Sequence, residues 1–223
     1  MGITGLIIFG DSILAGTGAS DREFGCAKLV KNGLGIPVSL RARNWNTSRD
    51  GLGRLEEDVI MQPQFSHVLV LFGNNDSWLS GPGQSKVPLE EFRKNLLEIV
   101  SRIKNNKQFP LLCNLQLINQ EVFMRKFPEL DEYRKVMKLT ANQIHQQYND
   151  AIERIANELG FGFIDIRSKL NSSSEECIAD DGIHPNDAGH KIMAEVILQY
   201  LQQIDITLKI LKTSSTAKHN QIK

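Results

Sequence analysis

Four polar side chains of the kinds used in acyl transfer are spread over this chain: Ser12, Asn75, Asp181 and His184. Acyl transfer needs a nucleophile, a base to take its proton, an acid to orient that base and N–H donors for the oxyanion. Ser12 would attack, and Nε2 of His184 would take the proton and later return it to the leaving group. Asp181 would accept from Nδ1–H of His184 and hold the useful tautomer. The Asn75 amide could donate to the oxyanion beside the Ser12 backbone N–H.

Each of these residues also has an ordinary structural interpretation. Asp11 or Ser12 could cap a helix through a side-chain oxygen, and Asp181 could cap the last helix or a turn. Asn75 could bond to its own backbone in a turn. We interpret the remaining histidines as surface or core residues; they are His67, His145, His190 and His219. No grouping of His, Cys and acidic residues has metal-ligand spacing, so we expect no metal site.

Two apolar runs would bring the candidate residues together. Residues 3–9 and 67–72 are nearly unbroken in their hydrophobicity, which is typical of strands buried on both faces of a parallel sheet. Gly10-Asp11-Ser12 follows the first run, and Gly73-Asn74-Asn75-Asp76 follows the second. Open α/β sheets bind ligands at the carboxyl edge of their strands. We therefore expect Ser12 and Asn75 to meet at that edge, with Asp181 and His184 in a loop that faces the same cleft.

Strands and helices alternate along the rest of the chain. Further strands are expected at 36–43, 110–118 and 161–166, and amphipathic helices lie between them. This order predicts an α/β fold with one domain over residues 1–206, a parallel sheet of about five strands and helices on both faces. A polar tail would follow at 207–223. Residues 119–140 have no regular apolar spacing and are interpreted as an insertion, either a substrate wall over the sheet edge or a segment packed on the body.

The composition limits the classes of partner. The 26 basic residues of the 223-residue chain balance 26 acidic ones, which gives no electrostatic case for nucleic acid or an anionic membrane surface. We expect no membrane span and no secretion signal. The three cysteines are expected to be free, mostly buried thiols in a reducing compartment; they are Cys26, Cys113 and Cys177. The predicted location is therefore the cytoplasm.

The order of three motifs resembles the GDSL, or SGNH, hydrolases. These motifs are Gly10-Asp11-Ser12, Gly73-Asn74-Asn75-Asp76 and Asp181-Gly182-Ile183-His184-Pro185, and the resemblance spans about residues 3–200. It implies a three-layer flavodoxin-like fold and a serine hydrolase of the esterase, lipase and thioesterase type without a cofactor. It also implies Ser12 as nucleophile, His184 as base, Asp181 as its partner and Asn75 in the oxyanion hole. The absence of a Gly-x-Ser-x-Gly elbow separates the chain from ordinary α/β-hydrolases.

One position departs from the family pattern. The family's second block usually has a glycine a few residues before a Thr/Ser-rich turn, and when Thr47-Ser48-Arg49-Asp50-Gly51-Leu52 is matched to that stretch, the place of the glycine falls on Trp45. Its backbone N–H can still serve the oxyanion hole with Ser12 and Asn75. If a positive φ is needed there, the strain is of order 1–3 kcal/mol. The indole could narrow the acyl pocket, stack on a sugar or aromatic group, or pack under the loop. We also expect substrate contacts from Trp45, Asp11 and Gly73.

The leading hypothesis is therefore an esterase that cleaves small or medium acyl groups from small-molecule carboxylic esters. A thioesterase or a carbohydrate O-acetyl esterase is the alternative within this class. Trp45 also motivates a weakly active or non-catalytic member that binds a ligand in the same cleft. A flavodoxin-like FMN binder shares the strand pattern, but the loop after the first strand has too few hydroxyls around a phosphate. Activity should rise between about pH 6 and 8, as expected for a histidine base.

Overall fold

The computed structural model of the chain describes residues 2–173 and 177–219. Its main sheet has five strands in the order β2-β1-β3-β6-β7, and every neighbouring pair is parallel. The strands are β1 (Leu6–Gly10), β2 (Val38–Ala42), β3 (His67–Leu71), β6 (Phe109–Cys113) and β7 (Gly162–Ile164). The predicted parallel sheet is confirmed, although several strands are shorter than the apolar runs suggested. Their order is that of doubly wound flavodoxin-like folds.

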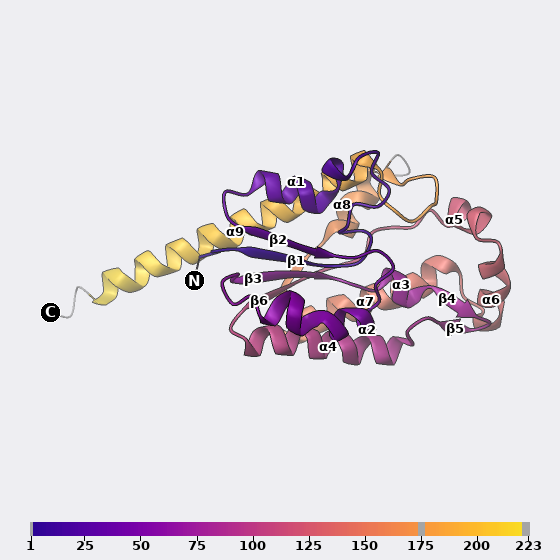
Figure 1. Cartoon of the computed structure of the whole chain (residues 1–223), viewed down its shortest axis with the longest axis horizontal. Helices are drawn as coiled ribbons and strands as arrows, with labels where there is room; N and C mark the ends of the chain where they lie inside the picture. Colours follow the sequence, from indigo (N-terminus) through magenta and orange to yellow (C-terminus); the bar gives the residue numbers. More distant parts are fainter. Residues whose placement is uncertain (1, 174–176, 220–223) are drawn as a thin grey trace.

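Helices cover both faces of this sheet, as Figure 1 shows. One layer packs α1 (Cys26–Gly33) and α8 (Ile166–Ser173) against α9 (Asp187–His219). The other layer joins α2 (Ser48–Leu55), α4 (Leu89–Asn105) and α7 (Ala141–Leu159). Helix α7 begins with a capping box between Thr140 and Gln143 and ends at Gly160 in the left-handed conformation. The predicted three-layer α/β architecture is therefore confirmed.

The neighbouring inner strands β1 and β3 end at the edge of the sheet where Ser12 and Asn75 lie. All residues of β1 and β3 are buried, whereas the edge strand β2 is only half-buried. Gly10 ends β1 where a Cβ atom would lie 2.5 Å from the backbone oxygen of Leu71. Only glycine therefore allows β1 and β3 to stay paired up to the turn that presents Ser12. Helix α3 (Asn74–Ser77) starts at the same edge, directly after β3.

The segments between these layers contain more regular structure than predicted. The turn-rich loop after α3 forms a small hairpin of β4 (Leu79–Gly81) and β5 (Gln84–Ser85). The insertion forms two short helices, α5 (Gln120–Lys126) and α6 (Glu129–Met137). Both lie at the end of the molecule where β4 and β5 lie (Figure 1). The remaining short elements are η1 (Arg22–Phe24) and η2 (Glu56–Ile60).

The C-terminal helix is longer than the sequence indicated. Its backbone remains helical to His219, whereas a polar tail was expected after residue 206. The serine-rich loop predicted around 171–175 begins inside α8, and its residues 174–176 lie outside the described part. Cys26, Cys113 and Cys177 are all buried. In the described part of the chain, no helix has the length and hydrophobicity needed to cross a membrane.

Candidate active site

Three side chains from distant parts of the sequence form a continuous hydrogen-bonded chain. Oγ of Ser12 lies 2.9 Å from Nε2 of His184, and Nδ1 of His184 lies 2.6 Å from Oδ2 of Asp181. Ser12 follows β1, while Asp181 and His184 lie in the loop before α9. We call these three residues the proton relay. Their arrangement allows the imidazole to take a proton from the hydroxyl while the carboxylate orients it.

The environment of Asp181 keeps its carboxylate ionised. Burial alone would raise its pKa, but the hydrogen bond from the His184 ring and those from two backbone N–H groups outweigh burial, and the pKa is lowered to about 2. Those N–H groups belong to Ile183 and His184, and each lies 2.9 Å from Oδ1 of Asp181. Asp181 therefore fills both roles considered for it. Its Oδ1 caps the turn, and its Oδ2 accepts the hydrogen bond of the His184 ring.

The oxyanion candidates lie beside Ser12. Nδ2 of Asn75 donates to the backbone oxygen of Asn46 at 2.9 Å, which fixes the amide and leaves its second hydrogen to point elsewhere. Trp45 adopts φ 64°, in the left-handed region where glycine is strain-free. Within the described residues, the backbone N–H groups of Ser12 and Trp45 donate to no other protein group. Asn75 is thus tied to the loop of Trp45 instead of to its own backbone.

A second hydrogen-bonded chain lies behind Ser12, and we call it the buried support. Asp11 accepts from the backbone N–H of Ile13 at 3.0 Å and from Nδ2 of Asn74 at 3.0 Å. Oδ1 of Asn74 lies 3.0 Å from Nε2 of His145, so this nitrogen must carry the donated proton. Burial lowers the pKa of His145 to about 3 and raises that of Asp11 to about 7. His145 is therefore uncharged at neutral pH, whereas Asp11 changes its protonation near pH 7.

Two predicted substrate contacts belong to this framework instead of to the pocket surface. Asp11 is fully buried, and Gly73 is a buried residue with φ 134° at the start of α3. Neither is among the residues that line the catalytic pocket. Asp76 has a similar supporting role, because its carboxylate accepts from the Ser48 backbone N–H at 3.0 Å and from the Ser48 hydroxyl. That contact joins α3 to the start of α2, next to the loop of Trp45.

The catalytic pocket has a volume of about 290 Å³ and contains the whole proton relay. Aromatic side chains make much of its wall: Trp45, Trp78 and Phe127. Trp45 is 64% exposed, so the expectation that it packs under the loop is wrong. Lys126 and Phe127 come from the insertion, which thus supplies a wall of the pocket. Phe123 and Leu130 of the insertion are buried in the core, so the same segment also packs on the body.

Sequence reasoning gave no role to Asn74, Trp78 or His145. Asn74 belongs to the Asn75 motif and Trp78 lies three residues after Asn75, so their proximity was available in the sequence. The insertion was expected as a possible substrate wall, and its Phe127 lines the pocket. No sequence pattern placed His145, which comes from α7.

Comparison with known proteins agrees with this geometry. Residues 8–192 match the model of the GDSL-like lipase/acylhydrolase family. The chain belongs to this family. It is accordingly a carboxylic ester hydrolase of the GDSL type, as the three motifs implied. The match covers the relay, the buried support, helices α1 to α8 and the start of α9.

Two curated relatives of this GDSL-type enzyme cover most of its length. An acetylxylan esterase of Geobacillus stearothermophilus is 30% identical over 82% of this chain and 80% of its own. An isoamyl acetate-hydrolyzing esterase of Saccharomyces cerevisiae is 24% identical over 88% of this chain and 85% of its own. The crystal structure of a lipase/acylhydrolase from Enterococcus faecalis superposes with a TM-score of 0.73 at 20% identity. It covers 90% of this chain and 96% of its own, and it shows the shared fold.

Proposed function

We propose that this enzyme hydrolyses carboxylic esters of small acyl groups through a serine acyl-enzyme. The observation that carries the proposal is the relay from Asp181 through His184 to Ser12, with donor–acceptor distances of 2.6 and 2.9 Å. His184 takes the Ser12 proton as Oγ bonds to the ester carbonyl carbon. The same proton then passes to the alcohol oxygen as its bond to that carbon breaks. A water molecule repeats the sequence on the acyl-enzyme and releases the acid.

Charge on the carbonyl oxygen needs donors that are already in place. The backbone N–H groups of Ser12 and Trp45 and the second hydrogen of the Asn75 amide supply three candidates. The left-handed backbone of Trp45 is the conformation that a glycine would adopt there, so tryptophan keeps a backbone donor at this position. This supports a working oxyanion hole over a non-catalytic, ligand-binding role. The pocket volume of about 290 Å³ lies at the lower end of small-molecule sites and favours a small ester.

The Ser12→Ala variant tests the proposal. It should lose labelling by a fluorophosphonate probe and at least about 10⁴-fold of the turnover of p-nitrophenyl acetate, because it lacks the hydroxyl that His184 activates to form the acyl-enzyme. The exposed Ser80 offers a matched control, and Ser80→Ala should be labelled and active like the wild type. Labelling that persists in Ser12→Ala would refute the assignment of the nucleophile.

A carbohydrate O-acetyl ester is the second candidate substrate, and the exposed indole of Trp45 favours it. Trp45 lines the pocket and meets the Trp78 ring edge-on at 6.5 Å, which leaves much of its surface open to solvent. A flat aromatic surface beside a catalytic serine suits a sugar ring. The acetylxylan esterase relative adds to this reading. A comparison of kcat/KM for an acetylated xylo-oligosaccharide, p-nitrophenyl acetate and an acyl thioester separates the three substrate classes.

A further inference from the structure

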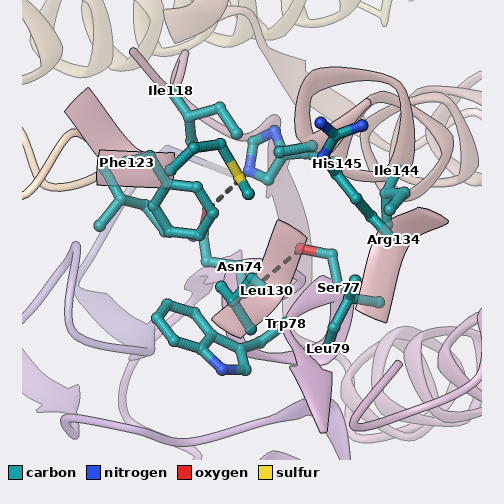
Figure 2. Close-up of a pocket in the computed structure, with 13 residues that line it drawn as sticks. Asn74, Ser77, Trp78, Leu79, Ile118, Phe123, Leu130, Arg134, Ile144 and His145 are labelled. Atoms are coloured by element: carbon teal, nitrogen blue, oxygen red, sulfur yellow. Dashed lines mark hydrogen bonds between the residues drawn. The ribbon is translucent and has the colours of Figure 1, made fainter. Parts of the chain in front are cut away.

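An inner cavity of about 30 Å³ adjoins the catalytic pocket and is lined by residues of α3, α5, α6 and α7, together with Leu79 of β4 and the loop residues Ile118 and Ile183. Figure 2 shows Trp78, Phe123 and Leu130 around one side, with His145 and Arg134 across from them. A space of this size holds one or two water molecules and no alkyl chain. The inner cavity is therefore too small, by itself, to bind part of a substrate.

Two spaces meet at three residues. Asn74, Trp78 and Ile183 line both the inner cavity and the catalytic pocket. Of these, Trp78 has the largest side chain, and it is held by edge-on contacts with three other rings. The ring centroids lie 6.5 Å from Trp45, 5.4 Å from Phe123 and 4.8 Å from Phe127. The indole thus lies in a fixed position between the pocket that holds Ser12 and the inner cavity.

The acyl part of an ester is the part that must face this indole. In the first half of the reaction the alcohol leaves and water takes its place, so the alcohol has to lie on the side open to solvent. The acyl group stays bonded to Ser12 and can occupy an enclosed region. Trp78 stands at the boundary of that region, since it lines both the catalytic pocket and the inner cavity.

We propose that Trp78 sets the acyl-chain length of this enzyme by closing the catalytic pocket against the inner cavity. This inference rests on the proposed ester hydrolysis and adds a specificity-determining residue to it. A side chain shorter than tryptophan at position 78 joins the two spaces, and the volume released by the indole adds to the 30 Å³ behind it. The wild type then prefers acetyl esters, whereas the opened variant accepts longer acyl chains.

The test compares p-nitrophenyl acetate, butyrate and hexanoate with the wild type and Trp78→Ala. The wild type should prefer acetate. Burial of each additional methylene is worth about fourfold in binding, so Trp78→Ala should raise the hexanoate-to-acetate ratio of kcat/KM about tenfold or more. A wild type that cleaves hexanoate as well as acetate overturns the proposal, and so does a variant that changes all three esters by the same factor.

A refilling variant identifies where the chain goes. Leu130 lines the inner cavity and is not among the residues that line the catalytic pocket. In the Trp78→Ala background, Leu130→Phe should remove most of the gain for hexanoate, because the larger side chain takes up space in the inner cavity. Leu130→Phe alone should leave the hydrolysis of acetate unchanged. A gain that survives Leu130→Phe would show that the chain takes another route and would refute the role of the inner cavity.

A binding measurement separates this inference from the proposed function. Acetate and hexanoate are titrated into each variant and followed by NMR, which requires no turnover. Trp78→Ala should strengthen hexanoate binding relative to acetate about tenfold, and thermal melting shows whether each variant is folded. Failure of the wild type to cleave any ester would refute the hydrolysis. An unchanged binding ratio would refute the role of Trp78.

Discussion

Two chains of hydrogen-bonded side chains meet at the turn after β1, and each contains one histidine and one aspartate. The proton relay joins Ser12 to His184 and Asp181 over distances of 2.9 and 2.6 Å. The buried support joins Asp11 to Asn74 and His145 over 3.0 and 3.0 Å. The relay side chains of His184 and Asp181 are 15% and 28% exposed, whereas Asp11 is fully buried. Similar residues thus form two very different systems.

The pKa values of Asp181 and Asp11 are shifted in opposite directions for a physical reason. Both carboxylates are penalised by burial, but Asp181 receives three N–H donors, including the His184 ring, and its pKa is lowered to about 2. Asp11 is fully buried, and this burial raises its pKa to about 7, with a smaller contribution from the charge of Asp76. Its two hydrogen-bond donors lower the pKa but do not outweigh burial. The number of donors and the degree of burial, not the residue type, decide which carboxylate can orient and stabilise a charged imidazole.

Removal of the relay charge gives the largest expected effect. Asp181→Asn keeps the shape of the side chain but presents an amide to Nδ1 of His184, which favours the wrong tautomer. In serine hydrolases with this arrangement, such a change lowers kcat about 10⁴-fold. Steady-state hydrolysis of p-nitrophenyl acetate measures it. The exposed neighbour provides the control, since Asp180→Asn should retain full activity. A loss of less than about tenfold in Asp181→Asn would contradict the assigned orienting role.

The motifs pointed to the relay for two reasons: two of its residues are close in sequence, and the third is positioned by the sheet. Asp181 and His184 are three residues apart in one loop, and Ser12 directly follows a central strand. Asn75 was placed near Ser12 by the same argument, since β1 and β3 are paired neighbours.

The buried support was not predictable in this way, and neither were the individual residues with which the insertion lines the pocket. His145 reaches Asn74 only because α7 packs against α3, and Phe127 reaches the pocket through the insertion. The two helices of the insertion were not predicted either, although the Asn119 side chain caps α5 by accepting a hydrogen bond from the Val122 backbone N–H. Asp11 was predicted to contact substrate because it adjoins Ser12. The tight turn after β1 instead directs Asp11 into the core.

The buried support should reveal itself in the pH dependence of stability. Between about pH 4 and 7, a carboxyl group whose folded pKa is about 7 binds more protons in the folded than in the unfolded state. The free energy of unfolding therefore falls as the pH rises through this range. In wild type, Asp11 should therefore cost up to about 4 kcal/mol of unfolding free energy between about pH 4 and 7. Asp11→Asn lacks this dependence. Urea denaturation at several pH values should show the wild-type stability falling relative to the variant.

The relay variant supplies the matched comparison for this measurement. Asp181 has a lowered pKa, so its stabilising contribution is complete above about pH 4 and is lost as the pH falls toward 2. Wild type should therefore gain about 2 kcal/mol relative to Asp181→Asn as the pH rises over that range. The two difference curves have opposite slopes and separate windows. Parallel curves for wild type and Asp11→Asn would show that Asp11 is ionised in the folded protein at neutral pH.

The smallest expected effect concerns a residue whose backbone matters more than its side chain. Relay and support are both defined by side-chain chemistry, whereas Trp45 is expected to serve the site through an N–H group in a left-handed conformation. A non-glycine residue in that region is strained by about 1–2 kcal/mol. Trp45→Gly and Trp45→Ala remove the same indole, including its edge-on contact with Trp78, but only glycine removes the strain.

Trp45→Gly should therefore be about 1 kcal/mol more stable than Trp45→Ala in urea denaturation, and both should hydrolyse p-nitrophenyl acetate with similar kcat. The comparison between the two variants cancels the loss of the indole, which a comparison with wild type would not. If Trp45→Ala were as stable as Trp45→Gly, the left-handed backbone would not be under strain. If only Trp45→Gly lost activity, the Cβ atom of residue 45 would be needed to hold the loop. The position of the backbone N–H donor would then depend on the side chain.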